Sequence, residues 1–161
     1  MTGQLSLRGT YLDPGFVQTK VSGELQLLSV LELSAGYELF TEREGGATDS
    51  VGIGQLGIGL QLGSEALGVR LTPGVHYLRF DDTPNGESGG ELSARLEAFP
   101  GPVVIRFEGR TGVIGETTTR VAAFELGWRF RRAVEVHAGW GGRVLGDVQL
   151  LGPRAGLKFW L

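Results

Sequence analysis

Apolar and polar residues alternate along almost the whole chain. The alternation has a period of two residues, which is typical of β-strands with one apolar and one polar face, and no segment shows a sustained helical spacing. About ten such segments follow one another, each near the roughly 9–11 residues with which a tilted strand crosses a membrane. They cover residues 4–12, 16–28, 31–39, 50–62, 67–77, 92–99, 103–113, 122–130, 134–141 and 154–161.

Turn-forming residues separate these segments, as expected for strands that run up and down in sequence order. Tight turns are predicted near Ser29, Gly63, Pro100 and Arg131. Longer connections alternate with them; the longest is predicted over residues 81–90, with further loops over 43–49 and 143–147. In the segment 50–62, Val51 and Ile53 are out of phase with the residues that follow, so a bulge near Gly54 is predicted.

The two faces of the segments decide the class of barrel. The polar face carries charges of both signs and many of the 28 glycines. A soluble barrel of the lipocalin type would place the apolar face inside and the charges in water, but a glycine-rich, sign-balanced face is unlike an ordinary solvated surface. The pattern therefore predicts an all-β fold: a single domain over residues 1–161, built as a transmembrane up-and-down antiparallel β-barrel of about ten strands with short turns and a polar, ion-paired interior.

The predicted interior is narrow, because about ten strands enclose little more space than long side chains fill. Unpaired charges there would be costly, so the inward charges are expected to pair with one another. The residues assigned to this charge network are Arg8, Lys20, Glu24, Glu32, Glu38, Arg70, His76, Arg95, Glu97, Arg106, Glu108, Arg110, Glu125, Arg129, Glu135, His137, Arg154 and Lys158.

Aromatic residues gather at the segment ends, as in the two interfacial girdles of a membrane barrel. The residues predicted to form the girdles are Tyr11, Tyr37, Tyr77, Trp128, Phe130, Trp140 and Phe159, extended by Phe16, Phe40 and Trp160. The longer connections are acidic, and their end of the barrel is predicted to face the outside of the cell. The acidic residues are Asp13, Glu44, Asp49, Asp81, Asp82, Glu87, Glu116 and Asp147.

The last segment resembles the C-terminal assembly signal of bacterial outer-membrane barrels. That signal has a polar residue, a glycine two positions later, and then two aromatic or apolar residues spaced by one. Arg154, Gly156, Phe159 and Leu161 fill these places, although the usual final residue is phenylalanine. The resemblance implies a location in the bacterial outer membrane, with the lipid bilayer, lipopolysaccharide and the barrel-assembly machinery as partners. No signal peptide is recognisable at the start of the chain, so one is expected to have been removed or omitted.

The sequence offers little for catalysis. His76 and His137 fall on the inward face, where structural pairing with a carboxylate is favoured over a role as a base. Asp81 and Asp82 lie near the rim, as the acidic residues of the omptin proteases do, but the loops are too short for a substrate cleft. The neighbouring His and Ser of the lipid A deacylases are absent. With no cysteine, no metal-ligand spacing and a net charge of −3, we expect no enzyme activity, no cofactor, no metal and no nucleic-acid partner.

Three functions remain open at this point. The first is a structural or scaffold barrel with a narrow or closed lumen, an architecture that resembles neisserial surface protein A. The second is a small porin-like pore for ions or solutes, in which the inward charges would set selectivity. The third is a surface-binding protein that acts through its acidic loops. The regularity of the pattern also fits an engineered barrel.

Overall fold

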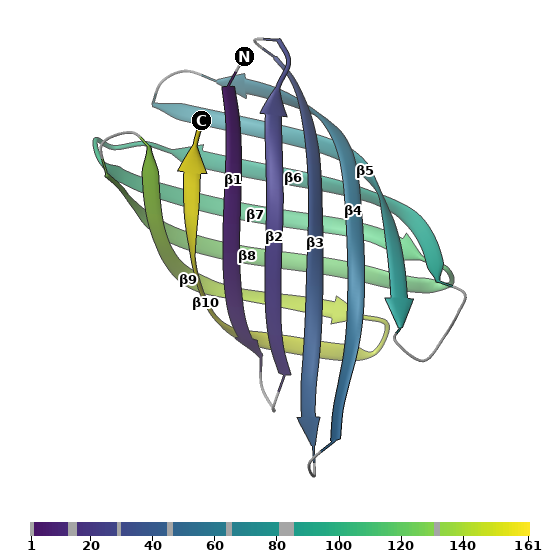
Figure 1. The fold of residues 1–161 in the computed structure, drawn as a ribbon. Helices are drawn as coiled ribbons and strands as arrows, with labels where there is room; N and C mark the ends of the chain where they lie inside the picture. The colour runs from purple at the N-terminus through teal and green to yellow at the C-terminus, as the bar shows by residue number, and fades with distance from the viewer. Residues whose placement is uncertain are drawn as a thin grey trace.

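The chain forms a closed antiparallel barrel in the computed structural model, which describes residues 2–12, 16–28, 30–44, 47–63, 66–80, 86–130 and 133–161 (Figure 1). Within those ranges only the backbone of residues 2, 43–44, 47–48, 70, 73 and 76–80 is described. The described residues make ten strands, namely β1 (Thr2–Leu12), β2 (Phe16–Gln26), β3 (Leu31–Glu44), β4 (Ala47–Gly63), β5 (Leu67–Phe80), β6 (Glu87–Ala98), β7 (Val103–Ile114), β8 (Thr117–Phe130), β9 (Val134–Leu145) and β10 (Val148–Trp160). Each strand pairs with its neighbours in sequence, so the predicted fold class is confirmed.

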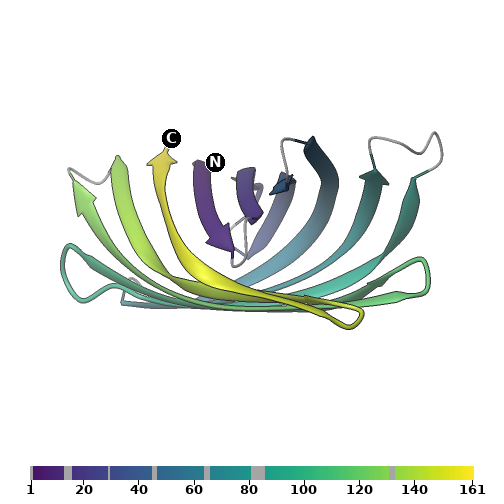
Figure 2. The ribbon, with the colours of Figure 1, turned by 90° about the horizontal axis from the view of Figure 1, so that it is seen from below.

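The first and last strands close the ring. β1 pairs with β10 from Gln4 opposite Trp160 to Thr10 opposite Arg154. Gly3 and Leu161 also exchange backbone hydrogen bonds of 3.2 and 2.8 Å. The two termini therefore lie side by side at one end of the barrel, and Figure 2 shows this end together with the strong bend along the strands. We name this end proximal and the opposite end distal.

The wall separates apolar from polar side chains, as the alternation predicts. Leucine, isoleucine and aromatic side chains cover the outside; Leu56 and Ile58, for example, are 60% and 58% exposed. Arg106, Glu125 and Glu135, in contrast, are buried inside. No helix in the described part of the chain is long and apolar enough to cross a membrane.

The distal connections are shorter than the sequence predicts. β3 continues to Glu44 and β4 begins at Ala47, β6 begins at Glu87, and β9 continues to Leu145. Polar and glycine-rich residues suggest loops, but backbone pairing tolerates them where their side chains face inward or lie at the rim. Gly115 and Gly146 open two-residue turns with a φ of 57° each, a conformation that glycine adopts without strain. Asp13, Asp81 and Asp82 lie outside the described residues, as does the side chain of Glu44.

The predicted bulge near Gly54 is wrong. The pairing of β3 with β4 continues in one register through Gly54, and Ile53 lies opposite Glu38. Ile53 is only 1% exposed because it points into the barrel, where it contacts other buried apolar side chains. We call this cluster the distal apolar layer; it consists of Leu12, Phe40, Ile53, Ile114 and Leu150. The prediction fails because it assumes that every apolar residue of a membrane strand faces outward.

Two of the predicted girdle residues lie inside the barrel at its distal end. Phe40 is part of the distal apolar layer, and Phe16 packs against it from β2. Members of the layer come from strands on opposite sides of the ring, including β1, β3 and β7. The layer therefore crosses the barrel near its distal end and fills the space there with apolar side chains.

The Ile53→Ala variant tests the contribution of this layer. Deleting a fully buried isoleucine leaves a cavity, so we expect the free energy of unfolding to fall by about 2–5 kcal/mol. The matched control is Ile58→Ala on the same strand, where the side chain faces outward and no enclosed cavity forms. Urea unfolding of the refolded barrel in vesicles, followed by tryptophan fluorescence, measures both variants. Equal losses for the two variants would contradict the inward placement of Ile53.

Candidate functional site

Strand β7 shows how the interior is layered from one end to the other. Its inward side chains, from the proximal to the distal end, include Val104, Arg106, Glu108, Arg110 and Ile114, and all five are buried. The signs of the charges alternate along the strand, and an apolar residue lies at each end of the series. The alternation lets each inward charge meet a charge of opposite sign from another strand.

Arg106 is the centre of the proximal half of the interior. Its Nε donates to Glu97 at 2.6 Å, and its two terminal nitrogens donate to Glu125 and Glu135, both at 2.8 Å. These carboxylates come from β6, β8 and β9, so one guanidinium connects four strands. A planar guanidinium can satisfy several carboxylates at once, which an ammonium group cannot do with the same fixed geometry.

Glu38 has the opposite role in the distal half. Its carboxylate accepts hydrogen bonds from Lys20 on β2 at 2.9 Å and from Arg143 on β9, and it pairs with Arg110 on β7 at 2.8 Å. The amides of Gln18 and Gln55 donate to it as well, at 3.0 and 3.1 Å. Glu38 is completely buried, so these contacts replace the water that an exposed carboxylate would bind.

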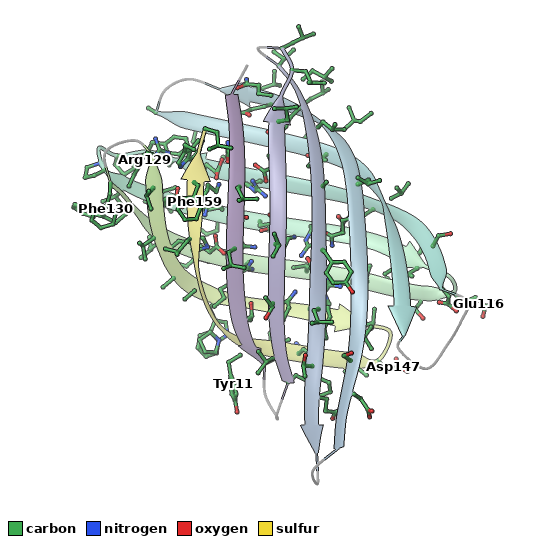
Figure 3. The ribbon with its side chains drawn as sticks, in the orientation of Figure 1. Tyr11, Glu116, Arg129, Phe130, Asp147 and Phe159 are labelled. Carbon is green, nitrogen blue, oxygen red and sulfur yellow. The ribbon has the colours of Figure 1, made fainter. Side chains whose placement is uncertain are left out.

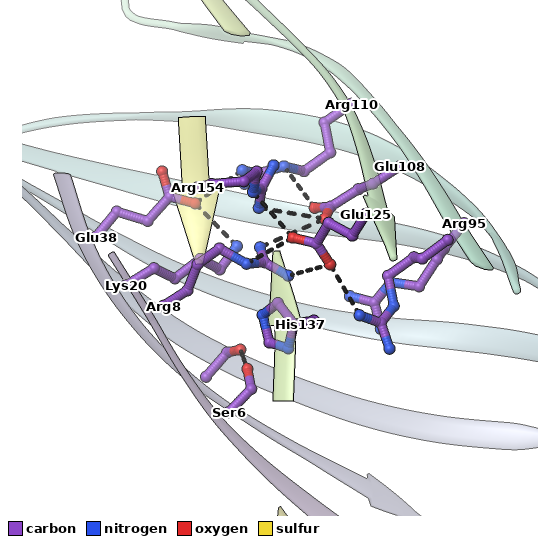
Figure 4. Close-up of polar contacts among 12 residues, drawn as sticks. Ser6, Arg8, Lys20, Glu38, Arg95, Glu108, Arg110, Glu125, His137 and Arg154 are labelled. Carbon is purple, nitrogen blue, oxygen red and sulfur yellow. Dashed lines mark hydrogen bonds and ion pairs between the residues drawn. The ribbon is translucent and has the colours of Figure 1, made fainter. Parts of the chain in front are cut away.

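Two further glutamates connect the halves (Figure 4). Glu125 pairs with Arg8 and Arg154, each at 2.9 Å, in addition to Arg106. Glu108 lies 3.1 Å from Arg110 and 3.6 Å from Arg8. The ion pairs therefore form one continuous network from Glu97 in the proximal half to Glu38 in the distal half.

At the proximal end of the barrel, an inward arginine stacks on aromatic rings instead of pairing with carboxylates. The guanidinium of Arg129 lies over the rings of Phe99 and Trp160, with distances of 4.8 and 4.5 Å to the ring centroids. No ion pair joins Arg129 to a described carboxylate, so its contribution is stacking rather than pairing. Trp160 also lies under the ammonium of Lys158, at 5.1 Å. The tryptophan therefore belongs to the interior and not to the outer girdle.

A small polar cavity remains beside the network. Its volume is about 60 Å³, enough for a few water molecules. Serine, threonine and glycine residues leave this space open, while charged residues border it. The lining includes Ser22, Ser34, Gly57, Thr72, Ser93, Lys20, Glu24, Arg95 and Arg110. Arg95 reaches across it to Glu24 at 2.8 Å.

The structure places the residues of the predicted charge network as follows. Those that are buried are Arg8, Lys20, Glu32, Glu38, Glu97, Arg106, Glu108, Arg110, Glu125, Glu135, His137, Arg154 and Lys158. Glu24, Arg95 and Arg129 are partly buried. The side chains of Arg70 and His76 lie outside the described residues. Nδ1 of His137 lies 3.7 Å from Glu135, within the proximal half of the network.

Arg143 is a charged member of the network that sequence reasoning missed. The sequence suggests a loop at this position, yet Arg143 is 4% exposed, pairs with Glu38 and lies 5.1 Å above the ring of Phe40. The alternation of inward and outward positions was the available signal, because Gly139, Gly141 and Arg143 continue the inward face of β9. Gln18 and Gln55 were missed for a different reason, because only charged residues were considered for the network.

Some of the predicted girdle residues on the described outer wall lie near an end of the barrel, whereas Tyr37 and Trp140 lie in the middle of β3 and β9. Figure 3 shows Tyr11 toward the distal end and Phe130 and Phe159 toward the proximal end. Together with Tyr37, Trp128 and Trp140 these side chains are exposed, and the side chain of Tyr77 lies outside the described residues. In the assembly-signal pattern, Phe159 and Leu161 are exposed, whereas Arg154 points inward to Glu125.

The interior offers no arrangement for metal binding among the described residues, where no group of three or more His, Asp or Glu side chains could hold an ion. The carboxylates are already engaged by arginine and lysine. The chemistry that this arrangement supports is therefore electrostatic: the ion pairs hold the strands of the barrel together.

Known proteins resemble this chain in fold and not in sequence. No protein-family model and no curated protein matches it. The KdgM porin superposes with a TM-score of 0.54 at 12% identity, over 97% of this chain and 98% of that chain. A de novo designed transmembrane β-barrel superposes with a TM-score of 0.51 at 13% identity, over 99% of this chain and 95% of that chain. OmpT without its loop L8, an outer-membrane protein of Vibrio cholerae, superposes with a TM-score of 0.50 at 10% identity, over 97% of this chain and 62% of that chain. This protein therefore has the fold of the bacterial outer-membrane β-barrels.

Proposed function

We propose that this protein is an integral barrel of the bacterial outer membrane with a closed lumen, and that it serves as a structural scaffold rather than a pore. The apolar outer wall with aromatic residues near both ends supports the membrane location, because such a surface is unfavourable in water and favourable in lipid. The fold shared with outer-membrane barrels supports the choice of membrane.

The observation that carries the closed lumen is the set of ion pairs between opposite walls. Glu38 on β3 pairs with Arg110 on β7, and β4, β5 and β6 separate these two strands on the shorter way around the ring. Arg95 on β6 likewise reaches Glu24 on β2. Side chains that meet across the barrel leave no continuous path for a hydrated ion. The distal apolar layer adds a second obstruction, because an ion would have to lose its water to pass it.

Conductance across a planar lipid bilayer tests the proposal. The protein is refolded in detergent, its folded state is confirmed by a heat-dependent shift on a gel, and its insertion by co-flotation with vesicles. We expect no discrete current steps from the folded, inserted barrel. Uniform steps of one size would mean that the lumen is open, and the protein would then be a narrow pore whose selectivity the inward charges set.

A further inference from the structure

The outer wall carries an apolar groove. It has a volume of about 750 Å³ and crosses strands β6 to β9. Its floor consists of small residues that lie in one register across the sheet: Ala94 opposite Gly109, Gly109 opposite Ala122, and Ala122 opposite Gly142. Nothing lies within 4 Å of the position that a side chain on Gly109 would occupy, so the floor is open to the surroundings.

Large side chains form the proximal wall of the groove. Leu96, Phe107, Phe124 and Trp140 lie in the adjacent register row, each opposite the next. The rings of Phe107 and Phe124 pack with their centroids 4.9 Å apart. At β10 the groove ends against Leu151, whose side chain covers Gly142. The result is an apolar depression across these strands.

The distal side of the groove carries a positive charge. Arg120 lies in the next register row, opposite Thr111 on β7 and Val144 on β9, and its side chain is exposed. Among outward-facing strand residues whose side chains are described, Arg120 is the charged one, and no described carboxylate pairs with it. A charge on the lipid face of a barrel is unfavourable unless it reaches the interface or meets an opposite charge.

We propose that this groove binds an anionic phospholipid, with the lipid phosphate at Arg120 and one acyl chain along the apolar floor. The inference rests on the proposed membrane location. A guanidinium is well suited to phosphate because its nitrogens can donate two parallel hydrogen bonds. The aromatic row and the small-residue floor offer an acyl chain a continuous apolar contact, and a zwitterionic lipid would bring no net negative charge to Arg120.

The tryptophans allow a direct test. Trp140 is part of the groove wall, whereas Trp128 faces lipid eight residues from Arg120 on the same strand, about 26 Å away along β8. The variant Trp128→Phe leaves Trp140 as the lipid-facing tryptophan, and Trp140→Phe leaves Trp128; Trp160 inside is common to both. Each variant is placed in vesicles that mix phosphatidylcholine and phosphatidylglycerol, with bromine on the acyl chains of one lipid at a time. Quenching then gives the relative affinity of each site for the two lipids.

At Trp140 we expect phosphatidylglycerol to be preferred about fivefold, the effect of one arginine near an anionic headgroup, and at Trp128 we expect no preference. Adding Arg120→Gln to the Trp128→Phe variant should abolish the preference. Ala122→Leu, which fills the floor, should also reduce it, while Ala155→Leu on the same outer wall outside the groove should not.

Three outcomes overturn the inference. The first is an equal lipid preference at the two tryptophans, and the second is a preference at Trp140 that survives Arg120→Gln. The third is a Trp140 that neither lipid quenches while Trp128 is quenched, together with a dimer in analytical ultracentrifugation, which would mean that a second copy of the chain occupies the groove. If neither tryptophan is quenched by any brominated lipid, the proposed membrane location itself fails, and this result is distinct from the other three.

Discussion

Replacing Arg106 with leucine is expected to lower the free energy of unfolding of the barrel by about 3–5 kcal/mol. The guanidinium donates to Glu97, Glu125 and Glu135, and all three carboxylates would stay inside without it. Glu135 would suffer most, because Arg106 is its hydrogen-bond donor at 2.8 Å while the ring of His137 lies farther away, at 3.7 Å. The loss is large because a buried charge is left unpaired, not because the ion pair itself contributes that much.

Urea unfolding in vesicles, as for the Ile53 variants, measures this loss. The matched control is Arg129→Leu, an inward arginine that stacks on Phe99 and Trp160 without pairing to a described carboxylate. We expect the control to lose about 0.5–2 kcal/mol, the range of a cation–π contact. Adding Glu135→Gln to Arg106→Leu should recover part of the loss, since one unpaired charge disappears. Equal losses for the two arginine variants would show that Arg106 is not the centre of the network.

The alternation of residues is sufficient to predict the wall of the barrel. Successive side chains of a membrane-barrel strand point alternately outward and inward, so apolar and polar faces follow directly from a period of two. This alternation alone also assigns Arg106, Glu108 and Arg110 to the inward face, where all three are buried. In β7 inward and outward positions alternate along the strand, although Val104 and Ile114 are apolar and face inward, and the observed strand has the predicted limits to within one residue.

The alternation of inward and outward positions could not predict which charged side chains contact one another. Glu38 and Arg110 are 72 residues apart and belong to strands that are not neighbours. Their contact depends on how the ring closes and how the strands tilt, and neither property is written in a local pattern. Arg143 was missed for another reason, because a position close to a glycine turn resembles part of a loop. The alternation therefore identified most of the charged members of the network but not its two centres, Arg106 and Glu38.

The distal apolar layer was missed because of an assumption about the solvent. In a soluble protein an apolar residue points inward, and in a membrane barrel the first expectation is that it points to lipid. Ile53 and Phe40 point inward even in a membrane barrel, because other apolar side chains surround them there. An interruption of phase in an otherwise regular strand is thus a signal for such a layer as well as for a bulge.

The distal apolar layer and the ion-pair network around Glu38 together lead to a prediction about ion conduction. We expect Glu38→Gln to convert the closed barrel into an anion-selective channel. The substitution keeps the shape of the side chain but removes the charge that holds Lys20, Arg110 and Arg143 together. These three cations would then repel one another in a narrow space, and water would enter to solvate them.

The distal apolar layer would not remain intact under these conditions. Arg143 pairs with Glu38 and stacks on Phe40, and Ile53 lies directly opposite Glu38 in the sheet. Movement of Arg143 toward water would therefore withdraw a neighbour from Phe40 and loosen the apolar obstruction. Cations that line the opened passage would attract anions and repel cations.

Reversal potentials in a salt gradient across a planar bilayer measure the selectivity. Glu38→Gln should give current steps whose reversal potential has the sign expected for anions. Arg106→Leu removes a cation and leaves Glu135 without its hydrogen-bond donor, so any current it carries should reverse with the opposite sign. Glu42→Gln is the matched control, because Glu42 lies on the same face of β3 and forms no ion pair with a described residue; it should stay silent. A folded, inserted Glu38→Gln barrel without current would show that the distal apolar layer closes the lumen without help from Glu38.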